Sequence, residues 1–408
     1  MSRHEPERVV VTGAGSLGWY GVGQDALAIA LAAGSPSFPE IERRTGVHPR
    51  KPARHAGLVD GSAIGEWVSP REGRRMGPAS RFTLAAARMA LQQAGTSAEA
   101  IGGPGFGIAL STAFGSTRMT EDLVLEILDD PESTSPFLFT ECVANAPAGQ
   151  IAIRLNAQGA NTTLTQREAG PLLSVIHAAR DIAAGRLDRA IVGAVEEMPP
   201  LTHAILDRFS ALAHQGLDGR ELPRPFDRDR DGIVASEGAT CLLLERESAA
   251  RARGAEILAV IAGWARAFDP TAPAHTWGAE PGPLADCLVE GLSRFGIVPE
   301  DISLIVSGAS GARRGDALEA GVLRASFGDR LPPIVTPKAV TGEFAGGLLG
   351  PGVLAITGAT FAMPAGFQRE DPALGLRPTA IDGPASRALL TGLASGGVST
   401  WLVLESAR

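Results

Sequence analysis

The residues around Glu168 have the layout of a nucleophile site without a nucleophile. Residues 160–165 are strand-like, residues 172–184 have the apolar period of a helix, and the segment 165–171 joins the two. Such a strand–turn–helix elbow directs backbone N–H groups and the helix dipole at one point. Enzymes place Cys or Ser there because this field favours a thiolate or an oxyanion. Glu168 is an anion that the dipole tolerates but a poor acyl acceptor, so we expect an enzyme-like scaffold that has lost its chemistry.

A second motif, Gly-Ala-Gly-Ser-Leu-Gly at residues 13–18, fits the dinucleotide-binding pattern G-x-G-x-x-G. The mechanism would be a tight turn that brings a pyrophosphate to a helix N-terminus. However, Trp19 and Tyr20 follow directly and do not begin a helix, and no clean strand ends in an acid about 20 residues later. We therefore interpret the motif as a glycine-rich turn between packed layers. No cofactor is expected.

The seven histidines show no metal-ligand spacing, so no metal site is predicted, and His177 is expected to be packed or on the surface. Cys142, Cys241 and Cys287 are an odd number without paired spacing, which predicts a reducing, cytoplasmic location and no disulfide framework. Cys241 lies in an apolar run and is expected in a strand core. The first residues lack the apolar region of a signal peptide.

Composition indicates a well-buried globular protein. Of the 408 residues, 44% are apolar and 20% are charged, and 50 are glycine, which suggests helices packed tightly on sheets. The net charge of −8 argues against nucleic acid and anionic membranes as partners. No run approaches the roughly 18 consecutive apolar residues of a spanning helix.

Strand and helix patterns alternate twice along the chain, which predicts two α/β halves of similar plan. We place these halves at residues 1–250 and 251–408. Expected strands lie at 8–12, 107–112, 160–165, 189–195, 239–245, 256–263, 302–307, 333–336 and 400–404. Expected helices lie at 24–33, 81–95 (capped by Ser80), 119–128, 145–155, 172–184, 282–295, 316–327 and 346–362. Residues 135–139 are expected to be extended, and 200–221 a long connection.

Together these segments resemble the β-ketoacyl synthases of fatty-acid and polyketide assembly, which belong to the thiolase-like superfamily. The resemblance covers essentially the whole chain. Its motifs are Val-Val-Val-Thr-Gly at 9–13, Arg-Arg-Met at 74–76, Asn145 with Ala148-Gly149, Arg-Pro-Phe-Asp-Arg-Asp-Arg-Asp-Gly-Ile-Val at 224–234 with Glu-Gly-Ala at 237–239, Pro-Lys-Ala-Val-Thr-Gly at 337–342, and Gly-Gly at 396–397. It implies a thiolase-like fold, in which two duplicated α/β halves form αβαβα layers.

The resemblance also implies which functional positions have changed. The family works with one Cys and two His, which take the acyl chain from acyl carrier protein and support decarboxylation of malonyl units. The nucleophile position falls on Glu168, the first His on Gly308 and the second His on Glu343. Only Lys338 is retained. A carboxylate cannot relay a thioester and a glycine offers no proton, so we expect no condensation by this chain alone.

The changed positions converge on one pocket in the family, so Glu168, Lys338 and Glu343 are expected to lie near each other. The three replacements could reflect drift or a new polar arrangement. Two carboxylates around one ammonium make a plausible buried triad, because the lysine offsets their repulsion. Our hypothesis is that the pocket has become a structural plug.

The resemblance points to a chain-length factor, a degenerate subunit that pairs with an active ketosynthase and shapes its acyl tunnel. Acyl carrier protein would be the other partner. Within the family, the resemblance points to the factor-like subunits of reducing type II systems, such as the aryl-polyene systems. A malonyl-carrier-protein decarboxylase is the alternative, which Gly308 and Glu343 disfavour because such variants keep the histidines. A hydrolase or transferase using Glu168 as base is a further rival. The helix dipole should keep the pKa of Glu168 low, which suits a general base poorly.

The resemblance also places tunnel residues. Phe114 matches a gating position, with an ordinary core Phe as the alternative. Glu141 and Cys142 precede the dimer-forming segment and are expected to line the tunnel wall, although Cys142 could equally be a small buried hydrophobe. The family's gating loop, Phe-Gly-Phe-Gly-Gly, reads Leu-Ala-Ser-Gly-Gly at 393–397. Losing both aromatic residues fits a subunit that no longer gates a nucleophile.

Overall fold

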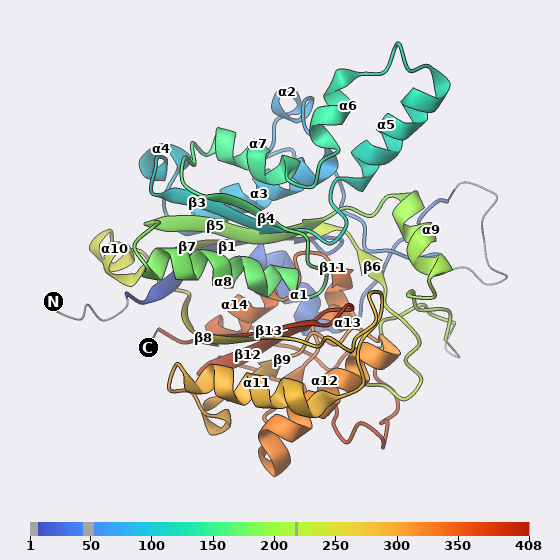
Figure 1. The fold of residues 1–408 in the computed structure, drawn as a ribbon, viewed down its shortest axis with the longest axis vertical. Helices are drawn as coiled ribbons and strands as arrows, with labels where there is room; N and C mark the ends of the chain where they lie inside the picture. The colour runs from blue at the N-terminus through green and yellow to red at the C-terminus, as the bar shows by residue number, and fades with distance from the viewer. Residues whose placement is uncertain (1–6, 44–52, 217–218, 408) are drawn as a thin grey trace.

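The computed structural model describes residues 7–43, 53–216 and 219–407, and its main strands form two runs of the same plan (Figure 1). The first run contains β1 (Val9–Gly18), β3 (Phe106–Ser111), β4 (Asn161–Leu164), β5 (Arg189–Glu196) and β7 (Gly238–Arg246). The second contains β8 (Ala259–Phe268), β9 (Leu304–Val306), β10 (Ile334–Val335), β12 (Arg387–Leu393) and β13 (Val398–Glu405).

The two runs share one pairing order. In each, the first strand along the chain pairs antiparallel with the fifth and the fifth antiparallel with the fourth. The fourth strand then pairs parallel with the second, and the second parallel with the third. This common order confirms the predicted duplication of two α/β halves. The division of the chain at residues 250 and 251 stays a prediction.

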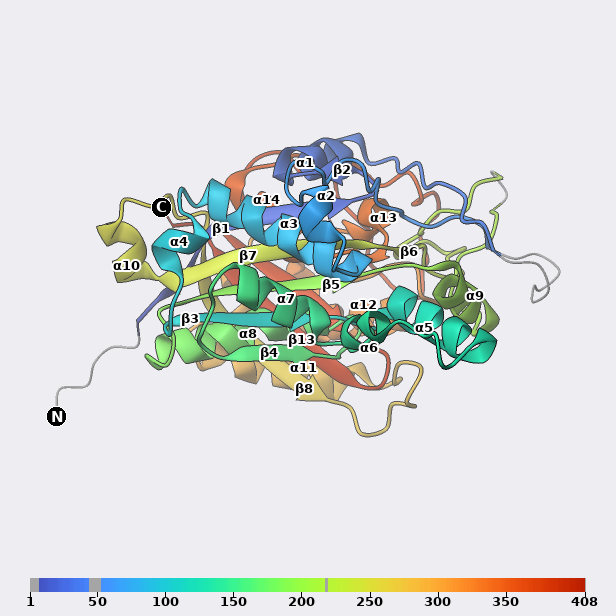
Figure 2. The ribbon, with the colours of Figure 1, turned by 90° about the horizontal axis from the view of Figure 1, so that it is seen from above.

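Helices cover both runs and fill the space between them, which gives the predicted αβαβα layers (Figures 1 and 2). The runs meet where β1 pairs with β8 at Val10–Val260 and Val11–Ala259. The outer layers contain α3 (Pro78–Gln93) and α7 (Ala146–Arg154) on one side, and α11 (Pro281–Ser293) and α12 (Arg313–Phe327) on the other. The middle layer contains α8 (Gly170–Ala183) and α14 (Leu349–Thr357).

Shorter elements surround these layers. They are β2 (Gly21–Val22), β6 (Ala235–Ser236), β11 (Glu343–Phe344), α1 (Gln24–Ala33), α2 (Pro70–Gly73), α4 (Ala98–Ile101), α5 (Thr117–Asp129), α6 (Pro136–Glu141), α9 (Pro200–Arg208), α10 (Glu247–Ala252) and α13 (Lys338–Thr341), with short 3-10 turns at Pro299–Asp301 and Gly328–Arg330. In the described part of the chain, no helix is long and apolar enough to span a membrane.

The interpretation of residues 13–18 as a turn is wrong, because the whole motif lies inside β1. Its glycines serve helix–sheet packing. A Cβ on Gly13 would lie 2.0 Å from the carbonyl oxygen of Ala90, and one on Gly15 would lie 2.2 Å from that of Ala86. Both carbonyls belong to α3, so the glycines let this helix lie close against the sheet.

Other local expectations also differ from the structure. The segment expected to be extended at 135–139 forms α6, whose Pro136 occupies the first helical turn, where proline is favoured. The connection after residue 200 contains α9, and strand β12 was not expected. Ser80 is not a cap, since α3 begins at Pro78. Cys241 is fully buried in β7, as predicted.

Candidate functional site

The elbow around Glu168 is held by close backbone packing. Strand β4 ends at Leu164 and helix α8 begins at Gly170, so Glu168 lies in the turn just before the helix. A Cβ on Gly170 would lie 1.9 Å from Oγ of Ser111 on β3. On the other side, a Cβ on Gly392 of β12 would lie 3.2 Å from the carbonyl oxygen of Glu168. The two glycines therefore let strands from both halves approach the elbow.

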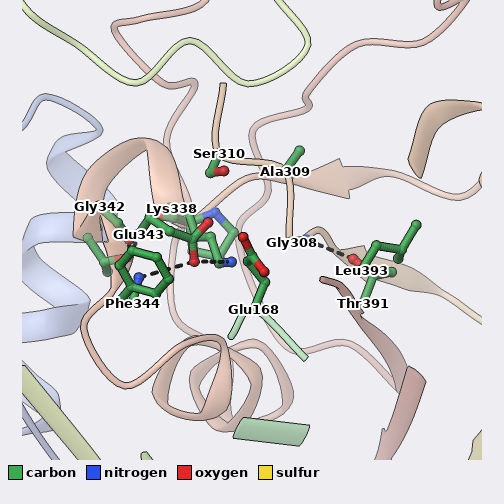
Figure 3. A network of polar contacts seen from close by, with 12 residues as sticks. Glu168, Gly308, Ala309, Ser310, Lys338, Gly342, Glu343, Phe344, Thr391 and Leu393 are labelled. Carbon is green, nitrogen blue, oxygen red and sulfur yellow. Dashed lines mark hydrogen bonds and ion pairs between the residues drawn. The ribbon is translucent and has the colours of Figure 1, made fainter. Parts of the chain in front are cut away.

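Lys338 and Glu343 form a buried ion pair beside this elbow (Figure 3). Lys338 begins α13, and Glu343 begins β11 after a turn at Gly342, whose φ is +78°. Nζ of Lys338 donates a 2.5 Å hydrogen bond to Oε1 of Glu343, and the same oxygen accepts from the N–H of Phe344 at 3.1 Å. Both charged side chains are only 2% exposed. The pair therefore neutralises itself inside the protein.

Glu168 does not form a hydrogen bond with Lys338 among the described residues. Its carboxylate accepts instead from Ser395: the N–H lies 3.1 Å from Oε2, and Oγ lies 3.4 Å from each carboxylate oxygen. Arg167 donates to Oγ of the same serine at 2.7 Å. The loop containing Ser395 is thus tied to the elbow by two neighbouring residues.

The environment of Glu168 raises its pKa to about 7. Burial is the main cause and the Glu343 carboxylate adds to it, while the N–H groups of Glu168 and Ser395 and the Lys338 ammonium oppose the rise. The expectation that the helix dipole keeps this pKa low is therefore wrong, because desolvation and a second carboxylate outweigh it. Part of the Glu168 residue is exposed to solvent, but its carboxylate is surrounded by protein groups.

A cavity of only about 10 Å³ remains at this place. Glu168, Glu343, Glu196 and Phe344 are among its lining residues. Glu168 and Glu343 thus line one cavity, and Lys338 forms an ion pair with Glu343. This volume corresponds to about one water molecule.

At Gly308, the position matching the family's first histidine, the structure has no space for a side chain. A Cβ there would lie 2.5 Å from the carbonyl oxygen of Thr391. The N–H of Gly308 donates to Oγ1 of Thr391 at 2.7 Å and to Oε1 of Glu319 at 3.2 Å. Glu319 also accepts from the hydroxyls of Ser307 and Thr391 at 2.6 Å each. Sequence reasoning missed Glu319, because no local pattern signals its contacts with Ser307, Gly308 and Thr391.

Phe114 lies in a loop held by a buried carboxylate. The N–H groups of Ala113 and Phe114 donate to Glu196 at 2.6 and 3.2 Å, and Oγ1 of Thr112 donates at 3.1 Å. Burial raises the pKa of Glu196 to about 8. The Phe114 ring packs edge-on against Phe344, with centroids 5.0 Å apart. Phe114 is therefore in contact with a residue that lines the cavity beside Glu168.

Glu141 and Cys142 lie apart from the cavity, at the end of α6. The Glu141 carboxylate is buried and accepts from the N–H of Gly77 and from Oγ of Ser80, both at 2.9 Å, so it caps the start of α3. The thiol of Cys142 donates to the carbonyl of Phe139 at 3.3 Å. Their tunnel-wall roles stay predictions.

Two other expectations concern residues outside the site. His177 lies on α8 with 43% of its side chain exposed, 3.9 Å from Asp181, so it is a surface residue. All three cysteines are free. No group of three potential metal ligands occurs within residues 7–43, 53–216 and 219–407.

Comparison with known proteins agrees with this architecture. The family model "Beta-ketoacyl synthase, N-terminal domain" matches residues 6–250, and the corresponding C-terminal model matches residues 258–367. The ketoacyl synthase alpha subunit of tetracenomycin polyketide synthase from Streptomyces glaucescens is 29% identical over 389 residues, which cover 91% of this chain and 90% of that protein.

Two solved structures resemble the fold over nearly its whole length. The ishigamide ketosynthase/chain length factor has a TM-score of 0.88 and 27% identity, and the match covers 99% of this chain and 100% of that one. The ketosynthase AntDE, solved in complex with its acyl-carrier protein AntF, has the same TM-score and coverage with 24% identity. The second likeness concerns the fold alone.

Proposed function

The chain belongs to the β-ketoacyl synthase family, and on that premise we propose that it is a non-catalytic, chain-length-factor subunit. It pairs with an active β-ketoacyl-carrier-protein synthase and shapes that enzyme's acyl tunnel during type II polyketide or related chain elongation. Acyl carrier protein delivers the substrate to the pair. The similarity to the ishigamide ketosynthase/chain length factor supports this assignment.

The observation that carries the proposal is the composition of the closed site. A condensing enzyme needs a nucleophile, a proton-transfer group and space for an acyl thioester. Here the elbow carries Glu168, the backbone at Gly308 leaves no space for an imidazole, and Glu343 is occupied by Lys338. The remaining cavity of about 10 Å³ cannot hold an acyl chain. The condensing-enzyme frame is thus kept while its acyl-handling groups are replaced.

A partner surface is supported by exposed apolar residues on α5 and α6, which project from the layered body (Figures 1 and 2). No residue of α5 is buried, and this helix nevertheless carries large apolar side chains: Leu128 is 76% exposed and Val124 is 48% exposed. Phe139 of α6 is 67% exposed. Strand β4 also ends the sheet, and its outer edge pairs with no other strand of the described residues. Exposed apolar patches and free strand edges are typical of protein interfaces. We assign this face to the partner ketosynthase.

A carrier-protein surface is supported by a basic hollow of about 570 Å³ beside α2. Arg71, Arg74 and Arg75 are exposed and line it, and none of the three forms an ion pair within the described residues. Glu72 and Arg154 also line the hollow and form an ion pair with each other. Guanidinium groups suit phosphate and carboxylate ligands, so this hollow fits an acidic carrier protein bearing a phosphate-linked arm.

The second candidate function is a malonyl-carrier-protein decarboxylase. Its support is the elbow, which could still bind an acyl group near the N-terminus of α8. Decarboxylation in this family depends on imidazole groups, and the two matching positions are Gly308 and Glu343. The small cavity also disfavours it. We therefore rank the decarboxylase second.

The leading proposal has a more specific form, in which the chain belongs to an aryl-polyene or other reducing system.

The experiment that tests the proposal is co-expression with an active ketosynthase of the same organism. We expect a stable pair that elongates malonyl units only when both chains are present. A chain that instead forms a homodimer and releases CO₂ from malonyl carrier protein would support the decarboxylase. Product length is read by mass spectrometry of the released acyl chains.

A further inference from the structure

The carboxyl group of Glu168 is held by donors from two elements. The N–H of Ser395 points at Oε2 from the loop after β12, and the N–H of Glu168 itself also stabilises the carboxylate. The fourteen-residue helix α8 begins two residues later and directs its positive end at the same place. Two elements from opposite halves of the chain therefore converge on one carboxyl group, while burial and the Glu343 carboxylate favour its neutral form.

The opposite wall of this site holds an oxygen that lacks a donor. Oε1 of Glu343 is satisfied by Lys338 and by the N–H of Phe344. Oε2 of Glu343 is buried and accepts no hydrogen bond from the residues that the structure describes. Glu168 and Glu343 line the same cavity, and Figure 3 shows their side chains together with Lys338. A buried acceptor without a donor is costly, and the proton of a neutral carboxylic acid would satisfy it.

We propose that Glu168 is the internal ligand of a carboxylic-acid site, bounded by the N–H of Ser395 on one side and by Oε2 of Glu343 on the other. The substitution Glu168→Ala removes one CH₂–COO⁻ group. Acetate has the same heavy atoms as this group. Shortening Glu168 therefore opens a site for a small carboxylic acid such as acetate, which binds with uptake of one proton. The intact chain closes the site from within.

The charged groups facing this site set its pH dependence. Arg167 lies in the turn beside it and bonds to Ser395. Lys338 from α13, Glu343 from β11 and Glu196 from β5 complete its surroundings. Since acetate takes up a proton when it binds between these groups, its apparent affinity should fall as the pH rises from 6 to 8.

Chemical rescue of the full chain tests the proposal. Acetate should raise the Tm of Glu168→Ala by about 1–2 °C at five times its Kd, relative to chloride at equal ionic strength. Broadening of the carbon-13 acetate signal should report the same binding, and acetone, which has as many heavy atoms as acetate but no donor for Oε2 of Glu343, should not compete. Glu168→Gln keeps the site filled and should not respond. If Glu168→Ala does not fold, Glu168→Ser is the second vacated variant.

Three results would overturn the proposal. They are equal responses of the wild type and the vacated variants, rescue by chloride as strong as by acetate, and binding that is independent of pH. The outcome is separable from the proposed function. Pairing with a ketosynthase depends on the α5–α6 face. A negative rescue experiment would therefore not change the result expected from co-expression.

Discussion

Nζ of Lys338 lies 2.5 Å from Oε1 of Glu343, and each of the two side chains is only 2% exposed. A buried pair of this kind is strongly destabilised when one partner is removed, because the other charge is left without compensation.

The first prediction concerns this pair. Lys338→Met should lower the free energy of unfolding by about 3–5 kcal/mol, because Glu343 then lies buried without its ammonium. The double variant Lys338→Met with Glu343→Leu should recover most of the loss. Urea denaturation measures both. If Lys338→Met leaves stability and complex formation unchanged, the plug hypothesis fails.

The second prediction follows from the raised pKa of Glu168, about 7 in the folded chain against 4.5 for the free side chain. The native state therefore binds this proton more tightly than the unfolded state. Its stabilising contribution is complete below about pH 4.5 and is lost as the pH rises through 7. The stability of the wild type relative to Glu168→Gln should thus fall between pH 5 and pH 8.

Denaturation curves at several pH values test this dependence. Glu290→Gln is the control, because Glu290 is exposed on α11 and should change stability little at any pH. A constant difference between the wild type and Glu168→Gln over this range would contradict the assigned titration.

The third prediction concerns tunnel length. Phe114→Ala removes a ring that covers roughly 150–200 Å² and packs on Phe344, so the pair should release longer acyl products. Mass spectrometry of the products is the readout. Phe295→Ala, at a ring that packs on Trp264 and not on Phe344, should leave the length distribution unchanged. If both variants give wild-type products, Phe114 is an ordinary packing residue.

The fourth prediction concerns pairing. Leu128→Asp places a charge at an apolar position of α5 that is 76% exposed, so it should weaken the complex at least tenfold without unfolding the chain. Ile29→Asp on α1, at a position 71% exposed, is the matched control and should pair normally. Analytical ultracentrifugation distinguishes the two. Normal assembly of Leu128→Asp would place the interface elsewhere.

Much of the fold could be predicted because long periodic segments decide it. Helix α1 and the strands of the first half lie where their apolar patterns place them. The failures are local. Residues 13–18 have the composition of a turn, and only the approach of α3 explains why glycines occur within a strand. Residues 136–141 form a helix whose first turn includes a proline.

Only part of the site could be predicted from the sequence. The changed positions Glu168, Gly308 and Glu343 could be located by motif, but their partners could not. Ser395 is 227 residues from Glu168, and no local pattern signals that contact. The pKa of Glu168 likewise depends on burial and on Glu343, which the helix dipole alone does not reveal.

The most direct test of the central claim is the intact mass of both subunits after loading the purified pair with acyl carrier protein. The account predicts an acyl adduct on the ketosynthase and an unmodified mass for this chain. An acyl adduct on this chain, or elongation by this chain alone, would contradict it.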